Sequence, residues 1–505
     1  MKRAKLGIIK SSQWVLLGKA AGVALQLCSN ILFARWLGPA DFGVFGLINT
    51  IAQILSCMLG LGLSNAAYKF VAESGQHDNE RVRHYLSLIL WTQIWVATGF
   101  VVLLWLARTL WLAKAFPMPL PAKTVALCLL LAWLNVFAAF FTSALNGLQL
   151  FREQNILNVL QYGVIVAAAW GLLGWGVIGA VLTYVIATAV FTGLCAFILG
   201  RSDARIFAPP PLRAYLDLRE VMPFGAPYLV IFILVGPITT AASVHLAGTT
   251  NGLYQLGLFN IANTLKTALG ILPLTLAPVL GTAIVQAGGA HGSSEDYERL
   301  LRNSYAALSL LVVTLLVGFM FLGDWLFLVY GRAYAEAFRV FLPLAASAGV
   351  YALVIPLEYT LLAKNKVWAI PLFCVIKAFF ILGVTRLLAG SLGAVGLSWA
   401  ILAAELAYCV LNVEFGIRKK LSPVFVRPFY YSSCCLMIGL MGLAWVLPDA
   451  WRWGLALPLG VGLATIIIHR HPPLVEHLTS MTPSFARPLM IRSLNLVISP
   501  TSTGH

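Results

Sequence analysis

Four charged side chains lie in the middle of long apolar stretches, where ionised groups are rare. They are two bases, Lys266 and Lys377, and two acids, Glu358 and Glu405. A charge at the centre of a bilayer costs about 2.5–3.5 kcal/mol on insertion scales, so it normally faces a water-filled cavity or an opposite charge. Either acid can therefore form a structural ion pair with Lys377, or bind a proton or Na+ and couple a transport step to an ion gradient. The sequence leaves both interpretations open.

Amide side chains follow one face of several of the same stretches, at 100° per residue. The stripes are Lys19, Gln26 and Asn30 on the first expected helix, Asn49 and Gln53 on the second, and Asn260 and Asn263 beside Lys266 on the eighth. Polar residues also favour helix packing in lipid, so a helix contact explains each stripe alone as well as a cavity does. Lys19 lies close enough to the expected membrane boundary to snorkel.

Two arginines, Arg35 and Arg386, lie near expected helix ends on the opposite side of the membrane from the termini. Arg35 either snorkels to the interface or places a cation at the mouth of a transport path. Cations suit phosphate oxygens, and amides suit hydroxyl groups. The combination predicts an anionic, hydroxyl-rich cargo whose charge meets Arg35, Lys266, Lys377 and Arg386.

No enzyme or metal site stands out in the sequence. Histidines lie mostly in expected loops, and the one inside a helix, His245, has no acid or cysteine near it in sequence. There is no Walker A loop for ATP. The eight cysteines nearly all fall inside apolar runs without metal-ligand spacing, as expected of small core residues. We predict no catalytic residue, no metal and no cofactor.

The composition identifies an integral membrane protein. Hydrophobic residues make up 60% of the 505 positions and charged residues 10%, and the mean hydropathy is +0.88. These values exclude a soluble globular domain. The net charge of +16 does not indicate a nucleic-acid partner, because the bases are scattered through short loops rather than clustered with aromatic residues.

Fourteen hydrophobic runs have about the 20 residues that cross about 30 Å of hydrocarbon. They are 13–37, 42–68, 86–112, 123–145, 156–173, 175–199, 221–246, 257–286, 304–330, 338–363, 369–389, 393–416, 430–447 and 452–468. An even number places both termini on one side, and 23 of the 34 lysines and arginines fall on that side against 8 on the other. The positive-inside rule predicts that both termini are cytoplasmic.

The first twelve spans contain two similar halves. Leu37, Gly43 and Phe45 match Leu246, Gly252 and Tyr254 after a shift of 209 positions, and Gly176, Gly179 and Ala180 match Gly393, Gly396 and Leu397 after 217. We expect an all-α fold of two six-helix bundles, related by a pseudo-two-fold axis along the membrane normal, plus two C-terminal helices. The expected domains are 1–212, 213–420, 421–470 and a poorly ordered cytoplasmic tail, 471–505. One water-filled cleft shared by the bundles would explain the stripes on helices two and eight together.

Four stretches carry a family resemblance. They read FARWLGPADFGVF (Phe33 to Phe45), GLGLSNAAYKFVAE (Gly60 to Glu73), NGLYQLG (Asn251 to Gly257) and GRAYAEAFRVFLPLA (Gly331 to Ala345). They resemble the LARxLGPxxFG, GLxxAxxRF, GLYxxA and GxxYxxAxxxLxxLA elements of Wzx-type polysaccharide flippases, in the multidrug/oligosaccharidyl-lipid/polysaccharide exporter (MOP) superfamily, which includes the MATE transporters. Phe33 replaces the leading leucine and Lys69 an arginine, so size and charge are kept. Lipid II flippases share the architecture, but their amino-terminal arginine-rich signature is not seen here.

The resemblance implies a cargo and a mechanism. The cargo is an oligosaccharide on undecaprenyl pyrophosphate, carried across the bacterial inner membrane to its periplasmic face by alternating access. The implied partners are this lipid-linked oligosaccharide, membrane lipids, H+ or Na+, and the polysaccharide polymerase machinery. One alternative is a drug/cation antiporter of the same superfamily, whose cleft is expected to be acidic or aromatic. Another is a membrane-embedded polymerase or ligase, which needs a long periplasmic loop, whereas the longest outer loops here have about ten residues.

Overall fold

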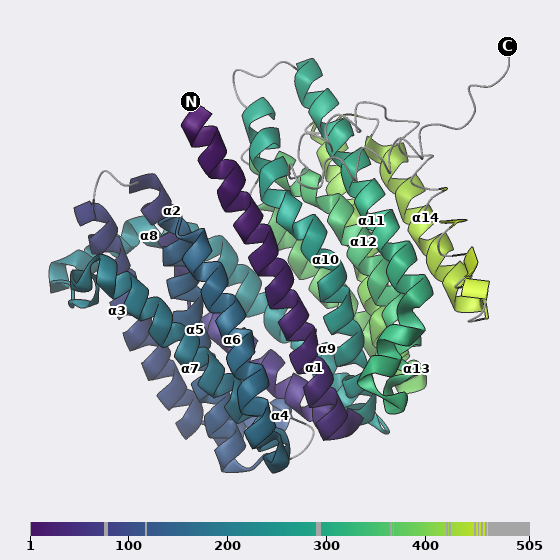
Figure 1. Cartoon of the computed structure of the whole chain (residues 1–505), viewed down its shortest axis with the longest axis horizontal. Coiled ribbons are helices and arrows are strands. Elements are labelled where there is room, and N and C mark those ends of the chain that lie inside the picture. The colour runs from purple at the N-terminus through teal and green to yellow at the C-terminus, as the bar shows by residue number, and fades with distance from the viewer. Residues whose placement is uncertain are drawn as a thin grey trace. The chain divides into compact units, whose positions relative to one another are not determined.

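A computed structural model describes residues 2–74, 79–116, 119–288, 294–363, 366, 368–420, 423 and 426–448, with short pieces between 451 and 462. All regular elements within these ranges are helices (Figure 1). Most of the predicted span 452–468 and the whole predicted tail, 471–505, lie outside the described residues.

The helices follow the predicted apolar runs. They are α1 (Lys2–Leu59), α2 (Leu63–Ser74), α3 (Asn79–Leu106), α4 (Arg108–Ala115), α5 (Ala122–Gly147), α6 (Phe151–Leu172), α7 (Gly176–Ser202), α8 (Leu218–Val230), α9 (Gly236–Ala247), α10 (Gly252–Gly288), α11 (Ser294–Tyr330), α12 (Ala337–Ala363), α13 (Ala369–Arg418) and α14 (Val426–Val446). A π-helical turn, Ile231–Val235, joins α8 to α9. The predicted span 221–246 that contains this turn also contains Pro223, Pro227 and Pro237, which make it a candidate hinge. Nine of the described segments are long and apolar enough to cross a membrane.

Two of the long helices each cover two predicted spans. Helix α1 contains a break at Gly38 (φ 72°, ψ 170°), and α13 contains one at Gly393 (φ 55°, ψ −131°). Both glycines adopt dihedrals that residues with a Cβ rarely reach. The chain therefore turns at a single non-helical residue, and a helix continues on either side of it. The prediction of about fourteen spans is consistent with this arrangement.

The chain forms two compact units. Unit 1 comprises residues 1–260 and 385–394, and unit 2 comprises 261–384 and 395–505. The predicted first lobe, 1–212, lies wholly in unit 1, which also takes in α8 and α9 because α8 packs on α2 and α9 packs on α1. The boundaries at 212, 420 and 470 stay predictions.

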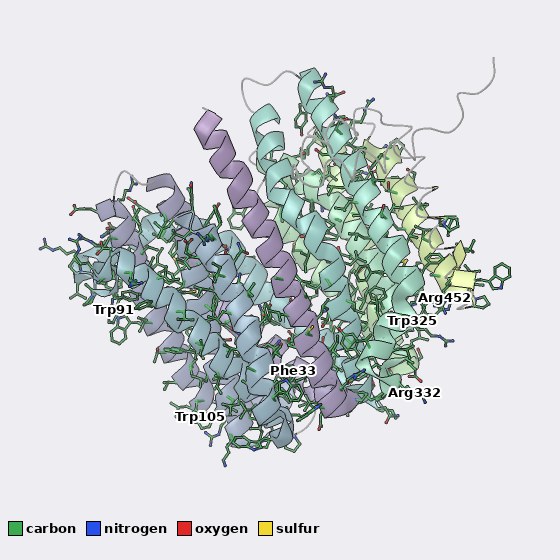
Figure 2. All side chains as sticks on the ribbon, viewed as in Figure 1. Phe33, Trp91, Trp105, Trp325, Arg332 and Arg452 are labelled. Atoms are coloured by element: carbon green, nitrogen blue, oxygen red, sulfur yellow. The ribbon has the colours of Figure 1, made fainter. Side chains whose placement is uncertain are left out.

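The hairpin motif of α1 is explained by close backbone packing within unit 1. A Cβ on Gly43 would overlap the carbonyl oxygen of Leu253, and a Cβ on Gly257 would overlap that of Pro39. The turn of α1 and the first turns of α10 therefore touch backbone to backbone. Phe33, labelled in Figure 2, is fully buried beside this turn, with its ring centroid 5.3 Å from that of Phe45.

A second break, at Gly60–Gly62, separates α1 from α2. The predicted second span continues through this break to residue 68, whereas the helix ends at Leu59. Gly62 has φ +69°, and a Cβ there would lie 2.6 Å from the carbonyl oxygen of Gly225 in α8. The family-like stretch that begins at Gly60 is thus a tight crossing of two backbones.

We expect Gly62→Val to lower the free energy of unfolding by about 1–3 kcal/mol, because it combines backbone strain with overpacking. Thermal unfolding in detergent measures the change. Gly99→Val on α3 is the matched control, since a Cβ at Gly99 meets nothing within 4 Å. Equal melting temperatures for the two variants would show that α8 moves aside without cost.

Candidate functional site

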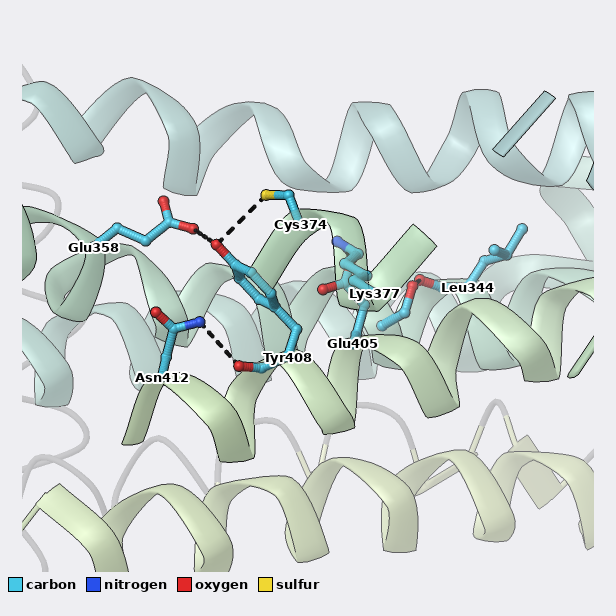
Figure 3. Close-up of polar contacts among 8 residues, drawn as sticks. Leu344, Glu358, Cys374, Lys377, Glu405, Tyr408 and Asn412 are labelled. Atoms are coloured by element: carbon cyan, nitrogen blue, oxygen red, sulfur yellow. Dashed lines mark hydrogen bonds and ion pairs between the residues drawn. The ribbon is translucent and has the colours of Figure 1, made fainter. Parts of the chain in front are cut away.

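A cluster of charged and phenolic side chains lies inside unit 2, where the part of α13 before the break at Gly393 contacts the part after it. Lys377 Nζ, before the kink, lies 2.6 Å from Glu405 Oε1, after it. Cys374 and Tyr408, each three residues further from the kink, also meet, with Sγ 4.0 Å from the phenolic oxygen. The two halves of α13 therefore run antiparallel, and their register sets the ion pair (Figure 3).

Lys377 is held by more than its carboxylate. Its Nζ lies 5.3 Å from the ring centroid of Tyr351 and 5.1 Å from that of Tyr408, which are cation–π distances. The side chain of Lys377 is 21% exposed, whereas that of Glu405 is 5% exposed. The cation is thus neutralised on one side and accessible on the other.

Glu358 on α12 joins the cluster through Tyr408. The Tyr408 hydroxyl donates a 2.6 Å hydrogen bond to Glu358 Oε1, and Asn412 Nδ2 donates to the Tyr408 carbonyl oxygen at 2.9 Å (Figure 3). Tyr408 therefore bridges the two acids, with its ring against the lysine that Glu405 pairs and its hydroxyl on Glu358. A change of protonation at Glu358 alters the hydrogen bond that positions this ring.

Two oxygens of the cluster lack donors within the described part of the chain. They are Glu405 Oε2 and Asn412 Oδ1, both buried. Buried acceptors are normally satisfied, so an orphaned carboxylate oxygen marks a place for a proton, a water molecule or a cation. Lys266 on α10 is partly buried within electrostatic range of Glu405 and Lys377. Among the described residues, no group of three or more His, Cys, Asp or Glu side chains is arranged to hold a metal ion.

Lys377 forms an ion pair with Glu405, and an ion-coupling role for Glu405 stays a prediction. Glu358, for which the same pairing was considered, instead accepts its hydrogen bond from Tyr408. Tyr408 and Tyr351, which contact Lys377 in the structure, are not among the predicted site residues. Sequence reasoning also missed Cys374, although the i, i+3 spacing from Lys377 puts both on one face.

The other predicted site residues are distributed as follows. In unit 1 the exposed ones are Arg35, Gln53 and Arg386, and the partly buried ones are Gln26, Asn49 and Asn260. Asn30, also in unit 1, is buried and donates to the Gln26 carbonyl oxygen. In unit 2, Asn263 is exposed, and the Lys19 side chain lies outside the described ones. Among the predicted site residues described in unit 2, those that cluster are Lys266, Lys377, Glu358 and Glu405. The shared polar cleft stays a prediction.

Unit 1 contains a cavity of about 520 Å³ that is mainly apolar. Its walls come from α1, α4 and α9, and include Ile51, Met58, Trp111, Pro237 and His245. The predicted stripe of Asn49 and Gln53 belongs to another face of α1. This cavity therefore does not correspond to the predicted hydrophilic path.

A family model described as polysaccharide biosynthesis protein matches residues 8–285, more than half of the chain. The chain belongs to this family. The EPS I polysaccharide export inner membrane protein EpsE of Ralstonia nicotianae is 22% identical to it over 380 residues, covering 72% of this chain and 83% of the relative.

Solved structures share the fold of this polysaccharide biosynthesis protein. The lipid II flippase MurJ, in an inward closed conformation, has 12% identity and a TM-score of 0.70, and the match covers 91% of this chain and 99% of MurJ. An inward-facing multidrug resistance MATE transporter of the MOP superfamily has 15% identity and a TM-score of 0.66, and covers 79% and 94%. The expected MATE-like all-α fold is confirmed, and so is the expected relation to polysaccharide proteins, through the family model. With nine described segments long and apolar enough to cross a membrane, the chain is a multi-pass membrane protein of this family.

Proposed function

We propose that this protein translocates an oligosaccharide linked to undecaprenyl pyrophosphate from the cytoplasmic to the periplasmic face of the inner membrane by alternating access. The observation that carries the proposal is the neutralised but accessible cation at Lys377, with Lys266 in its electrostatic neighbourhood. A diphosphate in bare hydrocarbon forfeits its hydration at prohibitive cost. Positively charged side chains inside the protein lower that cost, because they interact with the diphosphate in place of water.

The cluster supports an exchange of anions. A buried cation without a counter-ion is strongly unfavourable, so Glu405 serves as the counter-ion of Lys377 while no cargo is present. An incoming diphosphate, with more charge and more acceptor oxygens, takes the place of Glu405 on Lys377. The displaced carboxylate then needs a positive partner of its own. Uptake of a proton or Na+ at Glu405, and at Glu358 through Tyr408, would link cargo binding to an ion gradient.

Export in a strain that lacks the gene tests the proposal. Without the protein, lipid-linked glycan should accumulate on the cytoplasmic face, and the wild-type chain should clear it. We expect Lys266→Ala to reach the membrane at normal levels and to leave the accumulation in place. Lys123→Ala, at an exposed position where α5 begins, is the control and should restore export. Normal surface glycan with Lys266→Ala would remove Lys266 from the mechanism.

Glu358→Gln tests the coupling separately, because glutamine still accepts the Tyr408 hydrogen bond but cannot titrate. In proteoliposomes we expect the rate of gradient-driven flipping to fall about 5–150-fold, because typical coupling free energies correspond to changes of this size. Flipping without a gradient should persist. Imposing a proton or a sodium gradient in turn identifies the ion. Glu298→Gln, at an exposed position of α11, is the control. Full gradient dependence in Glu358→Gln would exclude Glu358 as the coupling group.

A further inference from the structure

The connector between α7 and α8, residues 203–217, and the first turn of α8 are fastened along α3 by four hydrogen bonds. Trp91 Nε1 donates to the Phe207 carbonyl oxygen (3.2 Å) and Ser87 Oγ to that of Ala208 (2.7 Å). Further along, His84 Nε2 lies 2.9 Å from Asp217 Oδ2, and the Tyr85 hydroxyl donates to Glu220 Oε2 at 2.8 Å. Two acids at the C-terminal end of this segment are thus engaged by α3. The connector is therefore held in a defined conformation against α3 and forms part of the surface of unit 1.

The opposite face of the connector is apolar and uncovered. Its last part, Leu212–Asp217, is a 3₁₀ helix, in which residues three apart lie on one line. Ala214 is buried on the same line as Asp217, so that line faces α3. Leu212 and Leu216 lie on the remaining faces and are 88% and 64% exposed, respectively. Exposing both leucine side chains to water would be unfavourable, because removing apolar surface from water lowers the free energy.

Neighbouring residues place this face at the level of a membrane surface. Phe197, one turn before the end of the spanning helix α7, is 58% exposed, as expected for a lipid-facing residue, and the Arg201 guanidinium lies over its ring at 5.1 Å. Trp91, in the part of α3 that contacts the connector, donates its indole N–H to the Phe207 carbonyl oxygen (Figure 2). Tryptophans and arginines at span ends are typical of the interface between hydrocarbon and headgroups.

The exposed charges around the leucines are mainly basic, and the exposed acid Glu220 already accepts a hydrogen bond from the Tyr85 hydroxyl. Arg201, Arg205, Arg213 and Arg219 are all exposed, and the positive-inside rule predicts that they are cytoplasmic. Asp203 accepts from both the backbone amide and the side chain of Arg205, and the backbone hydrogen bond lowers the pKa of this carboxyl. The outward surface therefore combines apolar side chains with guanidinium groups. Basic, apolar surfaces of this kind bind anionic lipid headgroups.

We propose that the connector docks on the anionic lipid surface of the cytoplasmic leaflet, with Leu212 and Leu216 inserted among the acyl chains and Arg213 and Arg219 at the phosphates. This interaction fixes the segment between the two halves of the chain to the membrane plane. This docking does not depend on which cargo the protein carries, so it is independent of the proposed function.

Spin labels test the docking without any transport assay. Cysteines at 212, 216 and, as a control, 205 are labelled in a background with the exposed Cys28 and Cys435 replaced by serine, and the full chain is reconstituted in bilayers containing phosphatidylglycerol. We expect labels at 212 and 216 to be more accessible to oxygen than to a water-soluble nickel chelate, and the label at 205 to show the reverse. Preferential nickel access at 212 and 216 would overturn the proposal. Low access to both reagents would also overturn it, because that pattern indicates a protein partner or a second copy.

The arginines are tested with a double variant, Arg213→Gln with Arg219→Gln, labelled at 212. In phosphatidylglycerol bilayers we expect this variant to lose several-fold in the oxygen-to-nickel accessibility ratio. In bilayers of phosphatidylcholine alone, the variant and the parent should give the same ratio. Equal ratios in both lipids would refute the contribution of anionic headgroups.

Discussion

Lys377→Ala is expected to abolish glycan export and to lower the free energy of unfolding by roughly 3 kcal/mol. This value is the lower end of the range for breaking a buried pair, because Lys377 is partly exposed while Glu405 is not. The substitution leaves a buried carboxylate that already has one oxygen without a donor among the described residues. Export is measured as surface glycan in the gene-deleted strain, and stability as thermal unfolding in detergent.

A double variant separates the structural role of this pair from its function. Lys377→Met with Glu405→Leu removes both charges, and such apolar replacements of buried pairs are often neutral or stabilising. We expect the double variant to recover most of the lost stability but not export. Arg427→Ala is the control, because it breaks the more exposed pair with Glu414 and should cost less stability than Lys377→Ala. Export restored by the double variant would mean that the pair only stabilises the fold.

Gly257→Val is expected to prevent accumulation of folded protein in the membrane. Its Cβ would overlap the carbonyl oxygen of Pro39, and backbone atoms cannot rotate away as a side chain can. Gly43→Val is expected to fail for the reciprocal reason, against the carbonyl oxygen of Leu253. Overpacking of a core typically costs about 1–3 kcal/mol when side chains yield, so a collision between two backbones should exceed that range.

Size-exclusion profiles of a fluorescently tagged chain measure the amount of folded protein. Gly163→Val on α6 is the matched control, since a Cβ there meets nothing within 4 Å, and it should accumulate like the wild type. A monodisperse Gly257→Val protein at normal levels would show that α10 can shift away from the hairpin. The motif would then need another explanation.

Most of the helices were predictable because membrane spans are set by length and apolarity, which are local properties. Where breaks fall was harder to predict. The third predicted span, 86–112, is divided at Ala107 between α3 and α4, and the second ends early at Leu59. The second break depends on what a neighbouring helix allows the backbone to do, as at Gly62 against Gly225. Hydropathy carries no information on such contacts.

The candidate site was predictable in its members but not in its connections. The cost of burying charge singled out Lys377, Glu358 and Glu405. Which acid pairs with the lysine depends on the register of the two halves of α13 across Gly393, and that register follows from three-dimensional packing. The same limit explains why Tyr408, an ordinary residue for a membrane helix, received no role although it touches both acids' surroundings.

Gly176 and Gly393, matched by the shift of 217 positions, both have a left-handed backbone, with φ of 64° and 55°. The residues around them have few identities, so what the two halves retain in common is a dihedral angle rather than a string of letters. Duplication of an ancestral half-length gene accounts for this pattern, with side chains free to diverge around a fixed bend. Genetic fusions that exchange one copy for the other should therefore be aligned on these two glycines.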